Sequence, residues 1–106
     1  VSLIGVADVD FYTAAKGAVS ALTRTLALQH GPAGVRVNAI APGVTMTERV
    51  IARSGGDVGN FPLARKQVLG PARPLDIANV ALFLASDEAA KVTGVVLPVD
   101  GGASAW

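Results

Sequence analysis

A tyrosine and a lysine four positions apart, Tyr12 and Lys16, are the residues whose types and spacing most directly allow chemistry. Residues at this spacing share one face of a helix. A free phenol has a pKa of about 10, and an ammonium within about 4–6 Å favours the phenolate. The pair could therefore exchange protons near neutral pH. Alone, it is equally compatible with a solvated helix lysine beside a half-buried packing tyrosine.

The element that carries this pair is a helix predicted over residues 11–30, which good helix formers dominate and a glycine- and proline-rich stretch from 31 to 34 ends. Its apolar residues recur at helical spacing on two faces. The first face comprises Ala15, Ala18, Val19, Leu22 and Leu26, and the second comprises Ala14, Gly17, Ala21 and Leu28. Such a helix can be packed tightly on both sides.

Short apolar segments before and after this helix predict strands. Residues 1–6 are interpreted as the end of a buried strand. Residues 35–41 alternate like a strand that ends at Pro42-Gly43, and residues 95–99 form a last strand closed by Asp100-Gly101-Gly102.

Residues 44–73 contain repeated glycines and prolines, which favour a binding loop or lid, with one short helix expected over 47–53. A second firm helix is predicted over 75–86, with Pro74 and Asp76 suited to its first turn. Alternating strands and helices predict a parallel α/β sheet.

Composition excludes several classes of function. The chain has 106 residues, a net charge of +1 with scattered basic residues, no cysteine and one histidine. A nucleic-acid or membrane partner is not indicated, and neither is a metal site. The hydrophobic fraction is 51% and the mean hydropathy +0.48, high for so short a chain. We therefore expect a piece of a larger domain, an expectation that the opening on Val1 inside an apolar run supports.

Three motifs stand in one order: Y-T-A-A-K at 12–16, V-N-A-I-A-P-G at 37–43 and V-T-G-V-V-L-P-V-D-G-G at 92–102. In this order they resemble the C-terminal half of a short-chain dehydrogenase/reductase, over essentially the whole chain. The resemblance implies the C-terminal part of a doubly wound, parallel-sheet Rossmann fold. Residues 1–106 would be the catalytic half of one such domain, without its N-terminal nucleotide-binding half.

The resemblance also implies roles for individual residues. Tyr12 would be the general acid-base, and Lys16 would lower its pKa and hold the nicotinamide ribose. Pro42 and Gly43 would let backbone approach the cofactor at the carboxyl end of a strand. Thr45, where isoleucine or valine is commoner, would meet the nicotinamide carboxamide through its backbone. The Thr47 hydroxyl would reach the carboxamide or pyrophosphate.

Other polar residues are assigned supporting roles. Asn38 is expected to bond backbone, His30 to sit at a helix end, and Asp100 to support a turn. The family's catalytic serine would fall before Val1, and Ser2 is not expected to replace it. No G-x-x-x-G-x-G or G-x-G-x-x-G turn for the pyrophosphate occurs, so the choice between NAD and NADP stays open and the segment alone is expected to be inactive.

The expected function is an NAD(P)-dependent interconversion of a ketone and a secondary alcohol, in a cytoplasmic homo-oligomer, a tetramer or dimer. Residues 44–70 would form a substrate lid with apolar character, from Val44, Met46, Val50, Ile51, Phe61, Leu63 and Val68. One alternative is a non-catalytic oligomerisation fragment that lacks a cofactor site. Another is a small independent binding domain, which the apolar outer face of the first helix disfavours.

Overall fold

The computed structural model describes residue 3 and residues 6–105, and its helices and strands follow the predicted order. The main elements are α1 (Asp10–His30), β1 (Ala39–Pro42), α2 (Glu48–Arg53), α3 (Pro74–Ala85) and β2 (Val96–Val99). Single-turn 3-10 helices lie between them: η1 (Gly31–Ala33), η2 (Val58–Asn60), η3 (Ala64–Lys66) and η4 (Asp87–Ala89). The strand end expected over residues 1–6 falls mostly outside the described residues.

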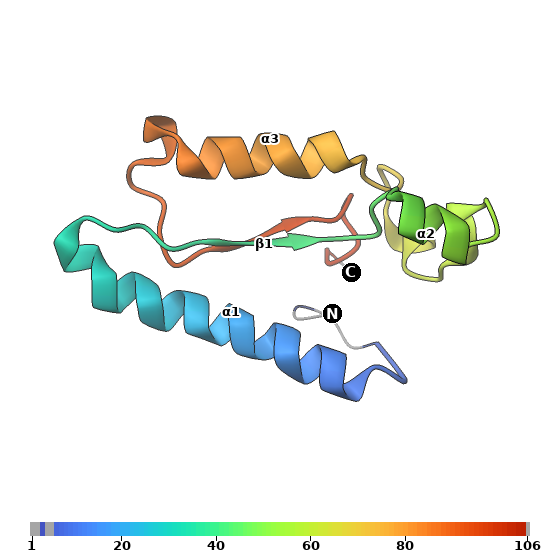
Figure 1. Cartoon of the computed structure of the whole chain (residues 1–106), viewed down its shortest axis with the longest axis horizontal. Helices are drawn as coiled ribbons and strands as arrows, with labels where there is room; N and C mark the ends of the chain where they lie inside the picture. The colour runs from blue at the N-terminus through green and yellow to red at the C-terminus, as the bar shows by residue number, and fades with distance from the viewer. Residues whose placement is uncertain (1–2, 4–5, 106) are drawn as a thin grey trace. The chain divides into compact units, whose positions relative to one another are not determined.

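Strands β1 and β2 are hydrogen-bonded neighbours in a two-stranded sheet (Figure 1). The Ala39 N–H donates to the Val95 carbonyl at 2.8 Å, and the Gly43 N–H donates to the Val99 carbonyl at 3.1 Å. Both bonds join residues at the same offset, so the strands are parallel and in constant register. The predicted parallel α/β architecture is confirmed.

The prediction of a strand over residues 35–41 was wrong at its start, because β1 begins only at Ala39. Before Ala39, hydrogen bonds that involve side chains connect the two segments in place of regular backbone pairing. The Val37 N–H donates to Thr93 Oγ1 at 3.0 Å, and Asn38 Nδ2 donates to the Val92 carbonyl at 2.8 Å. Residues 35–38 are thus tied to the chain before β2 without forming regular strand pairs.

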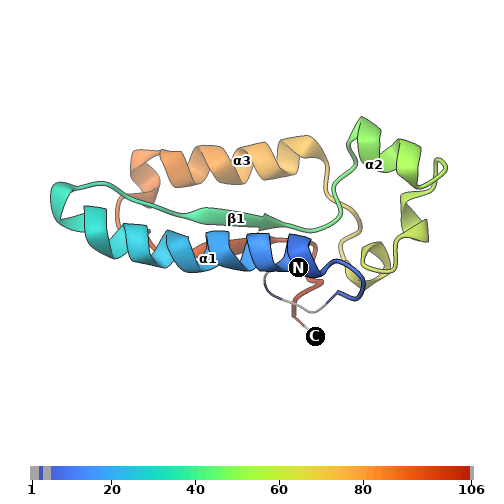
Figure 2. The same ribbon diagram turned by 60° about the horizontal axis from the view of Figure 1, so that its bottom comes forward.

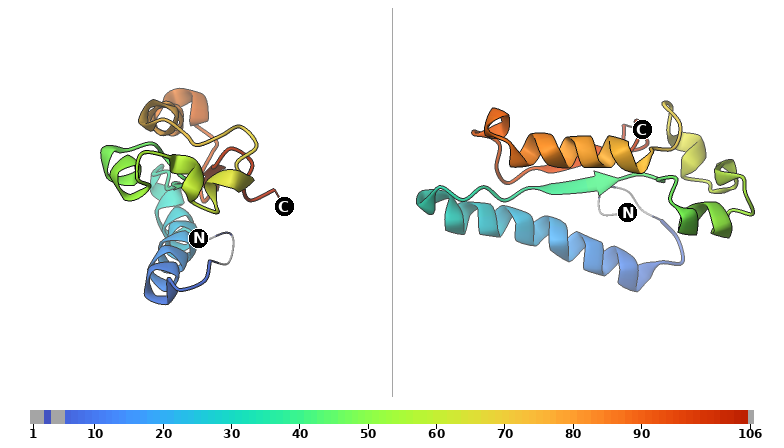
Figure 3. Two further views of the ribbon diagram at one scale, coloured as in Figure 1. Left: turned by 90° about the vertical axis from the view of Figure 1, so that its right-hand side faces the viewer. Right: turned by 45° about the horizontal axis from the view of Figure 1, so that its top comes forward.

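By its contacts the chain divides into two compact units: Val1–Ala41 with Phe83–Leu97, and Pro42–Leu82 with Pro98–Trp106. In the first unit, α1 runs alongside the segment that leads into β1, as two further views also show (Figure 3). The last turn of α3 is anchored there by Arg36, whose guanidinium donates to the carbonyls of Leu84 at 2.7 Å, Ser86 at 3.1 Å and Val92 at 3.3 Å.

Within this segment the buried positions of α1 differ from the apolar stripe, which stays mostly exposed, in keeping with the expectation of a piece of a larger domain. Ser20, Thr23 and Ala27 are buried, whereas Val19 and Leu22 are more than half exposed. The Ser20 and Thr23 hydroxyls are satisfied within the helix, by the carbonyls of the residues four positions earlier. Ala27 on this face lies against Gly94: a Cβ added to Gly94 would lie 3.4 Å from the Ala27 Cβ, an ordinary van der Waals contact.

In the second unit, α2 leads into an irregular segment in which η2 and η3 fold back as successive turns (Figure 2). Ala64, Gln67 and Ala103 are buried there, and Ser54 closes α2 with a 2.7 Å hydrogen bond to the Ile51 carbonyl. The expected loop over 44–73 therefore carries short helical turns. No helix within residues 6–105 has the length and apolarity needed to cross a membrane.

Candidate active site

Tyr12 and Lys16 lie one turn apart in the first half of α1. The Lys16 ammonium nitrogen is 5.3 Å from the centroid of the Tyr12 ring, a distance at which a cation interacts with the face of an aromatic ring. Tyr12 is 55% exposed, so its side chain is open to solvent. The structure therefore puts a phenol and a positive charge together on an accessible helix face.

Pro42 and Gly43 lie at the carboxyl end of β1, where Pro42 is the last strand residue. A Cβ added to Gly43 would lie 2.8 Å from the Asp100 Cα, closer than real Cβ atoms approach. Glycine is needed here because the two strand ends touch backbone to backbone. In open parallel sheets this edge is where ligands bind.

The next residues, 44–46, form a parallel bridge in which Thr45 pairs with Ala72. The Ala72 N–H donates to the Val44 carbonyl at 3.0 Å, and the Met46 N–H donates to the Ala72 carbonyl at 2.8 Å. In such a bridge the N–H of the central residue points to the opposite edge. The Thr45 N–H has no acceptor within the described part of the chain. It is a backbone donor suited to an incoming carbonyl.

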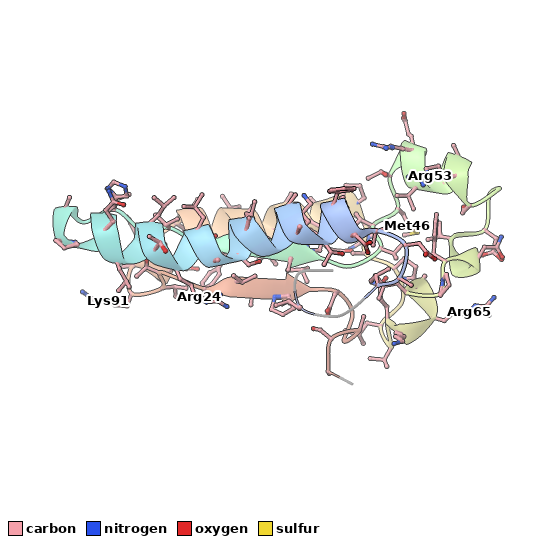
Figure 4. The ribbon with its side chains drawn as sticks, turned by 90° about the horizontal axis from the view of Figure 1, so that it is seen from below. Arg24, Met46, Arg53, Arg65 and Lys91 are labelled. Carbon is pink, nitrogen blue, oxygen red and sulfur yellow. The ribbon has the colours of Figure 1, made fainter. Side chains whose placement is uncertain are left out.

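Thr47 is the N-cap of α2, and its hydroxyl accepts a hydrogen bond from the Val50 N–H at 3.3 Å. A hydroxyl that accepts in this way still carries its own proton and can donate it. The predicted helix over 47–53 is confirmed within one residue, and its capping was detectable from threonine followed directly by Glu48. Met46, just before this cap, and Arg53, the last residue of α2, are labelled in Figure 4.

Asp100 holds the turn after β2. Its carboxylate accepts hydrogen bonds from the N–H groups of Gly102 and Ser104, both at 3.0 Å. Burial raises the pKa of Asp100, but the hydrogen bonds from the Ser104 side chain and from the Gly102, Ser104 and Ala103 backbone outweigh it and hold the pKa below its usual value. This agrees with the structural role expected from the sequence.

Two further polar residues occupy the expected places. Asn38 bonds only backbone in the described residues, donating to the Val92 carbonyl and accepting from the Val95 N–H at 3.1 Å. His30 is the last residue of α1. Ser2 lies outside the residues that the structure describes. The candidate site residues divide between the two units, with Tyr12 and Lys16 in one and positions 42, 43, 45 and 47 in the other.

One buried polar residue at this strand end had no recognisable sequence signal. Gln67 is only 4% exposed, and its Oε1 accepts a hydrogen bond from the Val44 N–H at 2.9 Å. Nothing in the stretch K-Q-V-L distinguishes this glutamine from a solvated one. The partnership depends on a contact between residues 23 positions apart.

Comparison with known proteins identifies relatives for the whole segment. A family profile described as enoyl-(acyl carrier protein) reductase matches residues 1–104. The 3alpha-hydroxysteroid dehydrogenase of Mediterraneibacter gnavus is 46% identical over 104 residues, which cover 97% of this chain and 41% of that protein. The chain thus spans about two fifths of this curated relative.

Solved structures of oxidoreductases are also similar to this chain over most of its length. An oxidoreductase of the short-chain dehydrogenase/reductase family from Burkholderia thailandensis is 41% identical with a TM-score of 0.80, covering 90% of this chain and 38% of that one. A proposed 2-deoxy-D-gluconate 3-dehydrogenase from Agrobacterium tumefaciens, solved with bound NADP, is also 41% identical, with a TM-score of 0.79, covering 90% and 39%.

Proposed function

Because the chain belongs to the short-chain dehydrogenase/reductase family, we propose that it is the catalytic C-terminal half of a Rossmann-fold domain in an NAD- or NADP-dependent oxidoreductase. The complete enzyme would interconvert a ketone and a secondary alcohol. The observation that carries this proposal is the accessible Tyr12 phenol with the Lys16 ammonium 5.3 Å from its ring.

Tyr12 handles the proton. In the reducing direction its hydroxyl donates the proton to the carbonyl oxygen of the substrate, and in the oxidising direction its oxygen takes the proton of the alcohol. Lys16 stabilises the negative charge on the phenol oxygen when the proton has left, because opposite charges a few ångströms apart attract strongly away from bulk water. Its ammonium would also hold the ribose hydroxyls of the nucleotide by hydrogen bonds.

When bound, the nicotinamide dinucleotide supplies the hydride chemistry. The residues after β1 fit its carboxamide. Thr45 offers a backbone N–H that has no acceptor among the described residues, and Thr47 keeps a hydroxyl proton that it can donate. Pro42 and Gly43 present backbone at the ligand-binding edge of the sheet. These four residues would orient the nicotinamide ring.

The substrate we propose is a secondary alcohol or ketone with an apolar body. Residues 44–70 would form its lid, and apolar side chains of this segment are open to solvent: Val68 is 68% exposed and Leu69 is 87% exposed. A related enzyme is named for a hydroxysteroid, an alcohol on an apolar skeleton.

Exposed apolar side chains also support a homo-oligomer, a dimer or tetramer. Phe11 and Leu28 of α1 are 93% and 82% exposed, and Leu82 of α3 is 70% exposed. A cytoplasmic location stays a prediction.

The same exposed apolar side chains favour the second candidate, a non-catalytic fragment that only mediates subunit contacts. Cofactor binding discriminates the two candidates, whereas oligomeric state does not.

The test is a titration of the complete protein with NADH and with NADPH, followed by the change in nicotinamide fluorescence. Saturable binding of either dinucleotide, together with turnover of a secondary alcohol, is the expected result. A folded protein that binds neither would contradict the oxidoreductase proposal and favour the interaction fragment.

A further inference from the structure

Gln67 is a buried amide whose partners among the described residues are all backbone groups. It is 4% exposed and follows η3 directly. Its Oε1 accepts from the Val44 N–H at 2.9 Å, and its Nε2 lies 3.4 Å from the carbonyl oxygens of both Val44 and Gly70. The Gln67 side chain therefore bonds both the N–H and the carbonyl of Val44, and it links them to the Gly70 carbonyl in the segment after η3.

The space around this amide is tight. A Cβ added to Gly43 would lie 2.7 Å from Gln67 Nε2, and one added to Gly101 would lie 3.1 Å from the Gln67 Cβ and 2.8 Å from the Gly70 carbonyl oxygen. A side chain at either glycine would collide with Gln67 or with backbone, so both positions need glycine for the amide to sit as it does. With 4% of its surface exposed, the amide is closely packed at this place.

Val44 and Met46 are held along one edge of the extended segment, Val44 by both Gln67 and Ala72, and Met46 by Ala72. The N–H of Thr45, between them, points to the other edge. Its direction therefore depends on how firmly its two neighbours are held. Gln67 provides the bond to the Val44 N–H, which Ala72 does not reach.

We propose that Gln67 is a positioning residue for cofactor binding: it fixes the Val44 backbone and so aims the Thr45 N–H at the nicotinamide carboxamide. This inference rests on the proposed oxidoreductase function. Because Gln67 is buried, it would act through the Val44 backbone and not by contact with substrate or cofactor. Its loss should therefore weaken dinucleotide binding more than it slows the proton transfer that Tyr12 performs.

Gln67→Met tests this in the complete enzyme, because methionine keeps the length of the side chain and removes the amide. We expect the Kd for the dinucleotide that the wild type prefers to rise about tenfold, equivalent to about 1.4 kcal/mol, while kcat at saturating cofactor changes by less than about threefold. An unchanged Kd in a folded variant would overturn the proposal.

The matched control is Ser54→Ala in the same unit. Ser54 is also buried, at 7% exposure, and its hydroxyl bonds only to the Ile51 carbonyl in the described residues. Ser54→Ala should lower the free energy of unfolding without changing the Kd for the dinucleotide. Equal loss of binding in both variants would show that any buried polar defect has this effect, and would also overturn the proposal.

Gln67→Glu gives an independent readout if the methionine variant does not fold. The introduced carboxyl keeps the acceptor for the Val44 N–H, but when ionised it has no proton for the Val44 and Gly70 carbonyls. Burial favours its neutral form, which can donate. Binding relative to the wild type should therefore improve as the pH falls. A ratio of Kd values that does not vary with pH would contradict the role.

Dinucleotide binding by the wild type shows whether the proposed function or only the role of Gln67 has failed. If it binds neither NADH nor NADPH, the proposed function fails and the role of Gln67 fails with it. If it binds one of them and Gln67→Met binds it equally well, only the positioning role is overturned.

Discussion

The ammonium of Lys16 lies over the ring of Tyr12, 5.3 Å from its centroid and one turn along α1. A lysine in this place can serve two partners, because its flexible stem carries three donors that can turn toward the phenol oxygen or toward ribose hydroxyls. The two roles have separable consequences in a variant that lacks the ammonium.

Replacing Lys16 with alanine in the complete enzyme should raise the KM for the dinucleotide and shift the rise in alcohol oxidation to higher pH. The first effect follows from lost ribose contacts and the second from lost charge beside the phenol. Steady-state kinetics across pH measures both. Lys91→Ala, which removes another exposed lysine of the same unit (Figure 4), should change neither. An unshifted pH profile would remove the electrostatic role of Lys16.

Arg36 should matter for stability rather than chemistry. Its guanidinium donates to three backbone carbonyls, the shortest at 2.7 Å to Leu84. A lysine keeps the charge but cannot reproduce the planar fork. We expect Arg36→Lys to lower the free energy of unfolding by about 1.5–3 kcal/mol, the range for hydrogen bonds to charged groups.

The control for this prediction is Arg24→Lys, because within the described residues the exposed Arg24 makes one long 3.5 Å bond, to the Ser20 carbonyl of its own helix (Figure 4). Surface changes of this kind fall within about 0.5 kcal/mol. Urea unfolding of both variants provides the comparison, and equal effects would contradict the anchoring role of Arg36.

Acid should remove the contribution of Asp76 at the start of α3. The Arg73 guanidinium and backbone N–H bond its carboxylate at 2.7 and 2.8 Å, and these bonds lower the pKa of Asp76 from 3.8 to about 2. A lowered pKa in the folded state means that the stabilisation is present above pH 3.8 and is lost as the pH falls through 2. The urea midpoints of wild type and Asp76→Asn should therefore differ above pH 4 and converge toward pH 2. A constant difference would contradict this.

The periodic elements were predictable because their signals are local. The helix expected over 11–30 is Asp10–His30, the one over 75–86 is Pro74–Ala85, and the strand over 95–99 is Val96–Val99. Capping residues and breakers adjacent in sequence mark such ends. The pairing of Tyr12 with Lys16 is also local, since it needs only one helical turn.

What could not be predicted depends on contacts between distant segments. Which residues of α1 are buried within this segment depends on distant residues such as Gly94, against which Ala27 lies. The start of β1 is delayed by side-chain bonds from Asn38 to residues more than 50 positions away. Gln67 meets Val44 only after the intervening turns have folded. Periodicity carries no information about any of these.

The most direct test of the account is the turnover of Tyr12→Phe in the complete enzyme, with dinucleotide binding measured on the same preparation. The substitution keeps the ring and removes only the hydroxyl that exchanges the proton. Turnover should fall at least about a hundredfold, with the dinucleotide still bound and the protein still folded. Turnover within about tenfold of the wild type would contradict the assignment of Tyr12 as the acid-base group.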